Sequence, residues 1–170
     1  MNSNKTALIT GATSGIGLAT AKCFAEHNFN LVLCGRNTEQ LQYLSTHLQT
    51  SVHTLCFDVR DKAEVSIQLE SLPPEFSDID ILINNAGNAH GLDYIQDGSL
   101  EDWDAMLDIN VKGLLYVAQP IIKKMVAQNS GHIINIGSTA GKEVYPKGNV
   151  YCASKHAVDA LNQAMRMDLN

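Results

Sequence analysis

A glycine-rich turn between an apolar strand and an amphipathic helix is the feature that most restricts what this chain can fold into. Residues 6–10 form a short apolar run, the sequence TGATSGIG covers residues 10–17, and a helical pattern of apolar residues follows. In such a unit the backbone N–H groups of the turn and the helix N-terminus face one point and can bind a phosphate. The order of these segments therefore predicts a parallel sheet with a nucleotide site at its edge.

Three glycines have separate expected roles in this turn. Gly11 permits the tight bend after the strand, whereas Gly15 and Gly17 let the cofactor and the helix approach the backbone closely. Their spacing is Gly-x-x-x-Gly-x-Gly, not the Gly-x-Gly-x-x-Gly of the commoner dinucleotide fingerprint. The residues that complete the predicted phosphate loop are Ala12, Thr13, Ser14 and Ile16.

Apolar runs of strand length alternate with helical patterns along the whole chain, which indicates a doubly wound α/β sheet. The expected strands are residues 6–10, 31–35, 52–57, 79–84 and 132–137. They lack clean polar–apolar alternation, as is typical of parallel strands buried on both faces. Ligands bind such sheets at the carboxyl ends of the strands. The residues expected to meet in that crevice are Gly11, Arg36, Asp58, Asn85 and Ser138.

Several residues mark where helices should begin or bend. Asn37, Asp61 and Ser99 are each followed three residues later by a side chain typical of a helix start, so they are expected to be N-caps. Pro120 interrupts a long helical pattern over residues 100–128. Because apolar residues continue on both sides of the proline, a kink is expected there and not a break.

The end of the second strand indicates which nucleotide binds. An NAD site usually has an acid about 20 residues after the glycine loop, and here Gly35 and Arg36 occupy that place. No acid is therefore expected to compete for Arg36. Arg36 can bind a 2′-phosphate through charge-assisted bonds of roughly 1.5–3 kcal/mol, with Thr13 and Asn37 as neutral donors. Ser14 adds no second positive charge, so the predicted preference for NADP depends mainly on Arg36. The alternative is an exposed arginine that merely opens a helix.

Tyr151 and Lys155 are spaced so that one helix presents both on the same face. A free tyrosine is a poor base at neutral pH, and a close lysine charge favours its phenolate, so the pair can exchange a proton with an alcohol or carbonyl. Ser138, at the end of the fifth apolar run, could hold the same oxygen. Taken alone, the spacing is more typical of an ordinary exposed helix. It indicates a catalytic pair only in combination with the glycine-rich turn.

Together these motifs resemble the short-chain dehydrogenase/reductase family. Residues 84–87 resemble its NNAG motif, and the pair Asp58-Val59 resembles the one that usually lies against the adenine. Three stretches, LPPEFSDIDILINNAG, GHIINIGSTAG and YPKGNVYCASKHAV, further resemble NADP-dependent serine and 3-hydroxy acid dehydrogenases. The resemblance implies a catalytic tetrad of Asn110, Ser138, Tyr151 and Lys155. It implies that NADP binds at Gly11, Ala12, Thr13, Ser14, Gly15, Ile16, Gly17, Arg36, Asn37, Asp58, Val59, Asn85, Ala86, Gly87, Tyr151 and Lys155.

The same resemblance implies a reaction. Tyr151 would take the hydroxyl proton of the substrate while hydride leaves for the nicotinamide, and reduction would run backwards. Ser138 would fix the substrate oxygen, Lys155 would also hold the nicotinamide ribose, and Asn110 would support a water that links Lys155 to solvent. The expected substrate is a small alcohol or carbonyl compound, specifically a 3-hydroxy acid such as serine. Two alternatives stay open: a reductase of 3-oxoacyl thioesters, and a non-catalytic cofactor-binding fragment.

The resemblance also bears on domain organisation and assembly. Residues 1–170 are expected to form a single Rossmann-like NADP-binding domain that is incomplete at the C-terminus, because members of the family continue with further strands and a substrate lid. When full length, the protein is expected to be a homodimer or homotetramer. Its twofold contacts would use the helices expected at residues 99–128 and 150–170.

Composition and charge narrow the partners and the compartment. The net charge of −6 argues against nucleic acid and anionic membranes, and no apolar run approaches the length of a membrane span. The start MNSNKTALIT lacks the regions of a signal peptide, so a cytoplasmic location is expected. The four cysteines are expected to be reduced and mostly in the core, with Cys152 the more exposed one. The histidine spacing predicts no metal site.

Overall fold

A single parallel sheet forms the centre of the computed structural model, which describes residues 5–169. Its strands are β1 (Thr6–Thr10), β2 (Asn30–Gly35), β3 (Val52–Cys56), β4 (Ile81–Asn84) and β5 (His132–Asn135), in the order β3-β2-β1-β4-β5. The chain moves outward from β1 to β3 and then returns to β4 on the other side of β1. The switch in direction therefore lies between β1 and β4, where ligands bind in open sheets of this kind.

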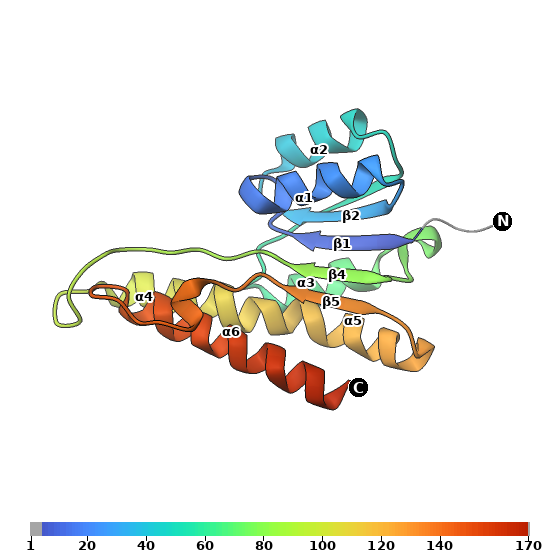
Figure 1. The fold of residues 1–170 in the computed structure, drawn as a ribbon. Helices are drawn as coiled ribbons and strands as arrows, with labels where there is room; N and C mark the ends of the chain where they lie inside the picture. The colour runs from blue at the N-terminus through green and yellow to red at the C-terminus, as the bar shows by residue number, and fades with distance from the viewer. Residues whose placement is uncertain (1–4, 170) are drawn as a thin grey trace.

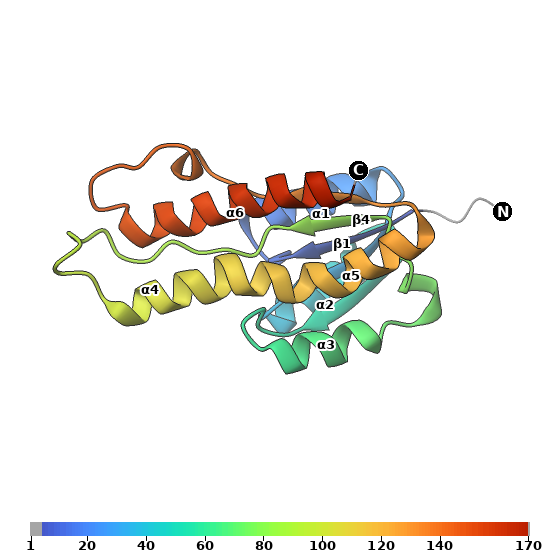
Figure 2. The same ribbon diagram turned by 90° about the horizontal axis from the view of Figure 1, so that it is seen from below.

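Helices cover both faces of this sheet (Figure 1). The helices are α1 (Gly15–Glu26), α2 (Thr38–His47), α3 (Lys62–Glu70), α4 (Leu100–Leu107), α5 (Leu114–Gln128) and α6 (Asn149–Asp168). Helices α1 and α2 pack on one face. Helices α3, α5 and α6 pack on the other, which Figure 2 shows from below. Short 3-10 turns lie at Pro74–Phe76 and Thr139–Gly141, and a π-helical turn lies at Asp108–Gly113.

Successive residues of the central strands enter opposite cores. Ile9 packs with the residues beneath α1 and α2, whereas its neighbour Leu8 packs with the residues of α3, α5 and α6, and both are fully buried. Because each central strand is buried on both faces, it has no polar face and reads as a continuous apolar run. The expected doubly wound parallel sheet is confirmed, with strand ends that differ from the expected ones by at most two residues at each end.

The expected helix starts are also confirmed. Asn37 Oδ1 accepts from Gln40 N at 3.0 Å, Asp61 accepts from two backbone N–H groups of α3, and Ser99 Oγ accepts from Asp102 N. Helix α5 continues through Pro120 without a break. The irregularity in this long helical segment lies upstream of the proline, in the π-helical turn, and no sequence pattern had indicated it.

The glycine-rich turn brings α1 very close to the end of β4. Gly11 has a left-handed φ of +65°, and a Cβ there would lie 2.8 Å from Asn85 Nδ2. A Cβ at Gly17 would overlap both the carbonyl oxygen of Gly11 and the amide nitrogen of Asn85. Only glycine fits at these two points, so the entry angle of α1 depends on them.

Substitution at Gly17 should therefore destabilise the fold more than substitution at Gly15. Gly15 has a φ of +52° but open space around its Cβ position, so Gly15→Ala should cost only about 1–2 kcal/mol of unfolding free energy through backbone strain. Gly17→Ala must push backbone atoms apart and should cost about 3 kcal/mol or more. Urea unfolding of the two variants measures the difference. A Gly17→Ala protein as stable as Gly15→Ala would contradict this packing.

Candidate functional site: a crevice at the carboxyl ends of the strands

A cavity of about 530 Å³ opens at the carboxyl edge of the sheet, across the switch between β1 and β4. Most of the residues expected from the sequence line it: Gly11, Thr13, Ser14, Gly15, Ile16, Arg36, Asn37, Asp58, Val59, Asn85, Ala86, Gly87, Tyr151 and Lys155. Ala12, Gly17 and Asn110 are buried and do not line it, and Ser138 lies beside it. The further lining residues, which the sequence had not singled out, are Cys34, Gly35, Phe57, Asn88, Ala89, Ile109, Ile136 and Gly137.

The N-terminus of α1 forms one end of this cavity. Ser14 is its N-cap, but its side chain makes no capping hydrogen bond, and Gly15 and Ile16 both line the cavity. The first N–H groups of a helix have no partner within the helix. This end of the cavity can therefore hold an anionic group such as a phosphate.

Thr10 joins the glycine-rich turn to the residues after β4. Its hydroxyl oxygen accepts from the backbone N–H groups of Asn85 and Ala86, both at 3.0 Å. In return, Asn85 Nδ2 donates to the carbonyl oxygens of Thr10 at 2.9 Å and Gly11 at 3.2 Å. The side chain of Asn85 therefore serves the architecture of the crevice, and sequence reasoning had missed the part played by Thr10.

Asn110 lies in the π-helical turn and is almost fully buried, at 2% exposure. Its Oδ1 accepts from Asn88 N at 2.8 Å, while its Nδ2 donates to Asn88 O at 2.9 Å and to Ser154 Oγ at 3.0 Å. A π-turn is often found at functional sites because it rotates a side chain out of ordinary helical register. Here Asn110 joins the segment after β4 to α6.

Lys155 extends from α6 into the floor of the crevice and is only 8% exposed. Its Nζ donates to the carbonyl oxygen of Ile136 at 3.0 Å. Burial lowers the pKa of this ammonium below its ordinary value. A Cβ at Gly87 would lie 3.6 Å from Lys155 Nζ and 3.1 Å from Asn110 Oδ1. The glycine of the NNAG motif therefore leaves room for these two polar groups.

Tyr151 stands at the boundary between two cavities. It is half-buried in the first turn of α6 and lines the large crevice together with Lys155. It also lines a second cavity of about 520 Å³, whose other lining residues are Ala89, His90, Gly91, Leu92, Tyr145, Lys147, Gly148 and Asn149. Ser138 caps the 3-10 turn that follows β5, where its Oγ accepts from Ala140 N at 3.2 Å.

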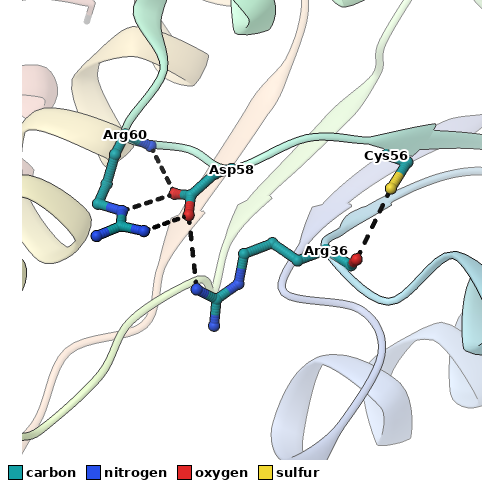
Figure 3. A network of polar contacts seen from close by, with 4 residues as sticks. All are labelled: Arg36, Cys56, Asp58 and Arg60. Carbon is teal, nitrogen blue, oxygen red and sulfur yellow. Dashed lines mark hydrogen bonds and ion pairs between the residues drawn. The ribbon is translucent and has the colours of Figure 1, made fainter.

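The expectation that no acid competes for Arg36 is wrong. Arg36 Nη1 lies 3.5 Å from Asp58 Oδ2, because the carboxyl ends of β2 and β3 are adjacent in the sheet (Figure 3). A second arginine, Arg60, holds the same carboxylate, so the charge at this end of the crevice does not depend on Arg36 alone. Hydrogen bonds from the Arg60 side chain hold the pKa of Asp58 below its ordinary value. The sequence signal for the contact between Asp58 and Arg60 was their spacing of two residues, which is typical of an Asx turn.

The cysteines follow the expectations in part. All four cysteines are free thiols. Cys152 is buried, which corrects the expectation that it is the more exposed one, and Cys23 and Cys56 are the exposed thiols. Burial raises the pKa of the Cys34 thiol. Over residues 5–169 no group of histidine, cysteine and acidic side chains could hold a metal ion, and no helix is long and apolar enough to cross a bilayer.

Comparison with known proteins assigns this fold and crevice to a family. The model of the family described as short chain dehydrogenase matches residues 5–170. The NADP-dependent 3-hydroxy acid dehydrogenase YdfG of Salmonella typhi is 45% identical over 163 residues, which are 96% of this chain and 66% of that protein. This chain therefore spans about two thirds of the length of such relatives.

Two solved structures of serine dehydrogenase also have a similar fold. The crystal structure of serine dehydrogenase from Escherichia coli has a TM-score of 0.93 and 42% identity, over 96% of this chain and 76% of that one. The closed form of serine dehydrogenase complexed with NADP+ has a TM-score of 0.92 and 42% identity, over 97% of this chain and 66% of that one.

The Asn110 hydrogen bonds should contribute strongly to stability. Asn110→Ala leaves the partly buried N–H and C=O of Asn88 without these partners, so the unfolding free energy should fall by about 2–3 kcal/mol. Ser154→Ala removes one acceptor while Asn110 Nδ2 keeps its bond to Asn88 O, so it should cost only about 1 kcal/mol. Chemical denaturation of both variants tests the order. Equal losses would mean that Asn110 does not hold the segment after β4.

Proposed function

Because the model of the short chain dehydrogenase family matches residues 5–170, this chain belongs to that family, and we propose that it is an NADP-dependent oxidoreductase. The observation that carries the proposal is one crevice in which an uncapped helix N-terminus, Arg36 and the Tyr151–Lys155 pair all line the wall. One cavity thus offers a helix N-terminus for a pyrophosphate, an arginine for a 2′-phosphate and a tyrosine for proton transfer.

The lining residues fit a dinucleotide in this order. The pyrophosphate would lie at Gly15 and Ile16, the 2′-phosphate at Arg36, and the adenine near Asp58 and Val59. When bound, NADP supplies the hydride acceptor or NADPH the hydride donor. The remaining residues of the proposed binding set line the same wall or pack directly behind it.

The chain's own residues would handle the substrate proton. Tyr151 accepts the proton of a substrate hydroxyl in oxidation and returns it to the carbonyl oxygen in reduction. Lys155 lies on the same helix face and lines the same crevice, so its ammonium would stabilise negative charge that develops on the substrate and tyrosine oxygens during the transfer. Ser138 would orient the substrate oxygen, and Asn110 would keep Lys155 and the segment after β4 in place.

We infer that the substrate is a small 3-hydroxy acid such as serine. The second cavity adjoins Tyr151, and its lining includes the cation of Lys147 and the ring of His90 but no acidic side chain. Such a lining suits a carboxylate more than the neutral chain of a thioester. The names of the relatives, a 3-hydroxy acid dehydrogenase and a serine dehydrogenase, agree with this inference.

We also propose a cytoplasmic homodimer or homotetramer with twofold contacts through α5 and α6. The exposed side of α6 carries the small residues Ala153, Ala160 and Ala164, while α5 exposes Leu115 and Val126. Small and apolar side chains of this kind allow two helices to approach closely. Leu161 packs against the core of the domain and would not take part. Four free thiols suit a reducing compartment.

Removal of Arg36 should weaken NADPH selectively. Arg36→Ala should raise the Kd of NADPH about ten- to a hundredfold, because a charge-assisted bond to phosphate contributes roughly 1.5–3 kcal/mol. The ion pair to Asp58 offsets little of this, since Arg36 is 68% exposed and the contact is 3.5 Å long. Arg36→Lys keeps the positive charge but lacks the planar guanidinium, so its Kd for NADPH should lie between those of the wild type and Arg36→Ala. Calorimetric titration with NADPH and NADH measures both, and equal losses for the two cofactors would exclude this role.

Removal of one oxygen atom from Tyr151 should abolish turnover but not binding. Tyr151→Phe keeps the ring that lines both cavities and removes the proton-transferring hydroxyl. Oxidation of serine by the whole protein, followed by NADPH absorbance, should fall at least about 100-fold, with an unchanged Kd for NADPH. Tyr43→Phe on α2 removes the same atom from an exposed tyrosine and serves as the control. Near-normal turnover in Tyr151→Phe would falsify the proposed chemistry.

A further inference from the structure

Asp58 lies between two arginines that hold it very unequally (Figure 3). Arg60 donates three hydrogen bonds to it: backbone N to Oδ1 at 3.0 Å, Nε to Oδ1 at 3.1 Å and Nη2 to Oδ2 at 2.8 Å. Arg36 makes one ion-pair contact, from Nη1 to Oδ2 at 3.5 Å. The carboxylate is therefore oriented by the hydrogen bonds from Arg60, whereas Arg36 makes only a longer ion-pair contact with it.

The exposed fraction of each side chain agrees with these unequal contacts, because Arg36 is the most exposed of the three. The Arg36 side chain is 68% exposed, that of Arg60 is 45% exposed and that of Asp58 is 26% exposed. Arg36 and Asp58 line the crevice, whereas Arg60 approaches the carboxylate from outside the lining. A ligand in the crevice can therefore reach Arg36 without displacing Arg60.

The charge balance explains what this arrangement does. With both arginines the cluster has a net charge of +1, and the charge of Asp58 is matched by Arg60. Without Arg60, Asp58 would have only Arg36 as a cationic partner among the groups that Figure 3 draws. The pair would then be neutral, and a 2′-phosphate would compete with Asp58 for Arg36.

We propose that Arg60 is a specificity-determining positioning residue, which holds Asp58 so that Arg36 stays available to a 2′-phosphate. The inference rests on the proposed function, in which the crevice binds NADP. It adds a second arginine to the cofactor preference, one that acts through a carboxylate and does not touch the ligand.

The test uses the two adenine half-ligands 2′,5′-ADP and 5′-AMP, which differ only in the 2′-phosphate. Arg60→Met keeps an unbranched side chain and removes the charge. Titration calorimetry at low ionic strength should show about fivefold weaker binding of 2′,5′-ADP, which is the contribution of one partly exposed ion pair. Binding of 5′-AMP should change less than about twofold, and added salt should shrink the difference.

A double variant separates this role from direct contact and from misfolding. Asp58→Asn in the Arg60→Met background removes the competing carboxylate, so the preference for 2′,5′-ADP over 5′-AMP should return to nearly the wild-type ratio. No recovery of the ratio would overturn the proposal, because Arg60 would then contact the phosphate itself or serve only the fold. An unchanged ratio in Arg60→Met alone would overturn it as well.

The wild-type protein distinguishes this inference from the cofactor proposal. Equal affinity of the unaltered chain for 2′,5′-ADP and 5′-AMP would overturn the assignment of NADP, and the role of Arg60 with it. A clear wild-type preference for 2′,5′-ADP, together with an Arg60→Met variant that keeps it, would overturn the role of Arg60 alone.

Discussion

The contact between the glycine-rich turn and the end of β4 is the constraint on which the rest of the site depends. Thr10 and Asn85 exchange hydrogen bonds across the switch point, and the backbone at Gly11 and Gly17 passes too close to Asn85 for any side chain to fit. This contact sets where α1 begins relative to the sheet. The anion-binding end of the crevice and the segment after β4 are placed by the same few atoms.

A second set of amide side chains holds the end of the crevice that Tyr151 and Lys155 line. Asn110 holds the backbone of Asn88 and reaches Ser154 on α6, one residue before Lys155. Farther along the sheet, Asn84 Nδ2 donates to Asn135 Oδ1, and Asn135 Nδ2 donates to Asn162 of α6. Helix α6 is therefore held to β4, β5 and the π-helical turn by polar contacts, which fix its register more sharply than apolar packing alone.

The electrostatics of the crevice differ from those of the chain as a whole. The chain has a net charge of −6, yet the crevice collects the cations of Arg36 and Lys155 and the N-terminus of α1. Its one carboxylate, Asp58, is held by Arg60. The crevice is therefore suited to an anion although the protein is acidic. Solvent ions screen distant charges, so the potential in the crevice depends on the charged groups that line it more than on the net charge of the chain.

Much of this protein was determined by local sequence. The order of apolar runs predicted the strands, the caps at Asn37, Asp61 and Ser99 predicted the helix starts, and the glycines predicted the tight turn between β1 and α1, because each depends on neighbours in the chain. Tertiary structure alone decided the pairing of Arg36 with Asp58, the place of Asn110 in a π-turn and the burial of Cys152. These features arise where β2 meets β3 and where the π-turn and α6 pack together, and such contacts between distant residues leave no pattern in a single sequence.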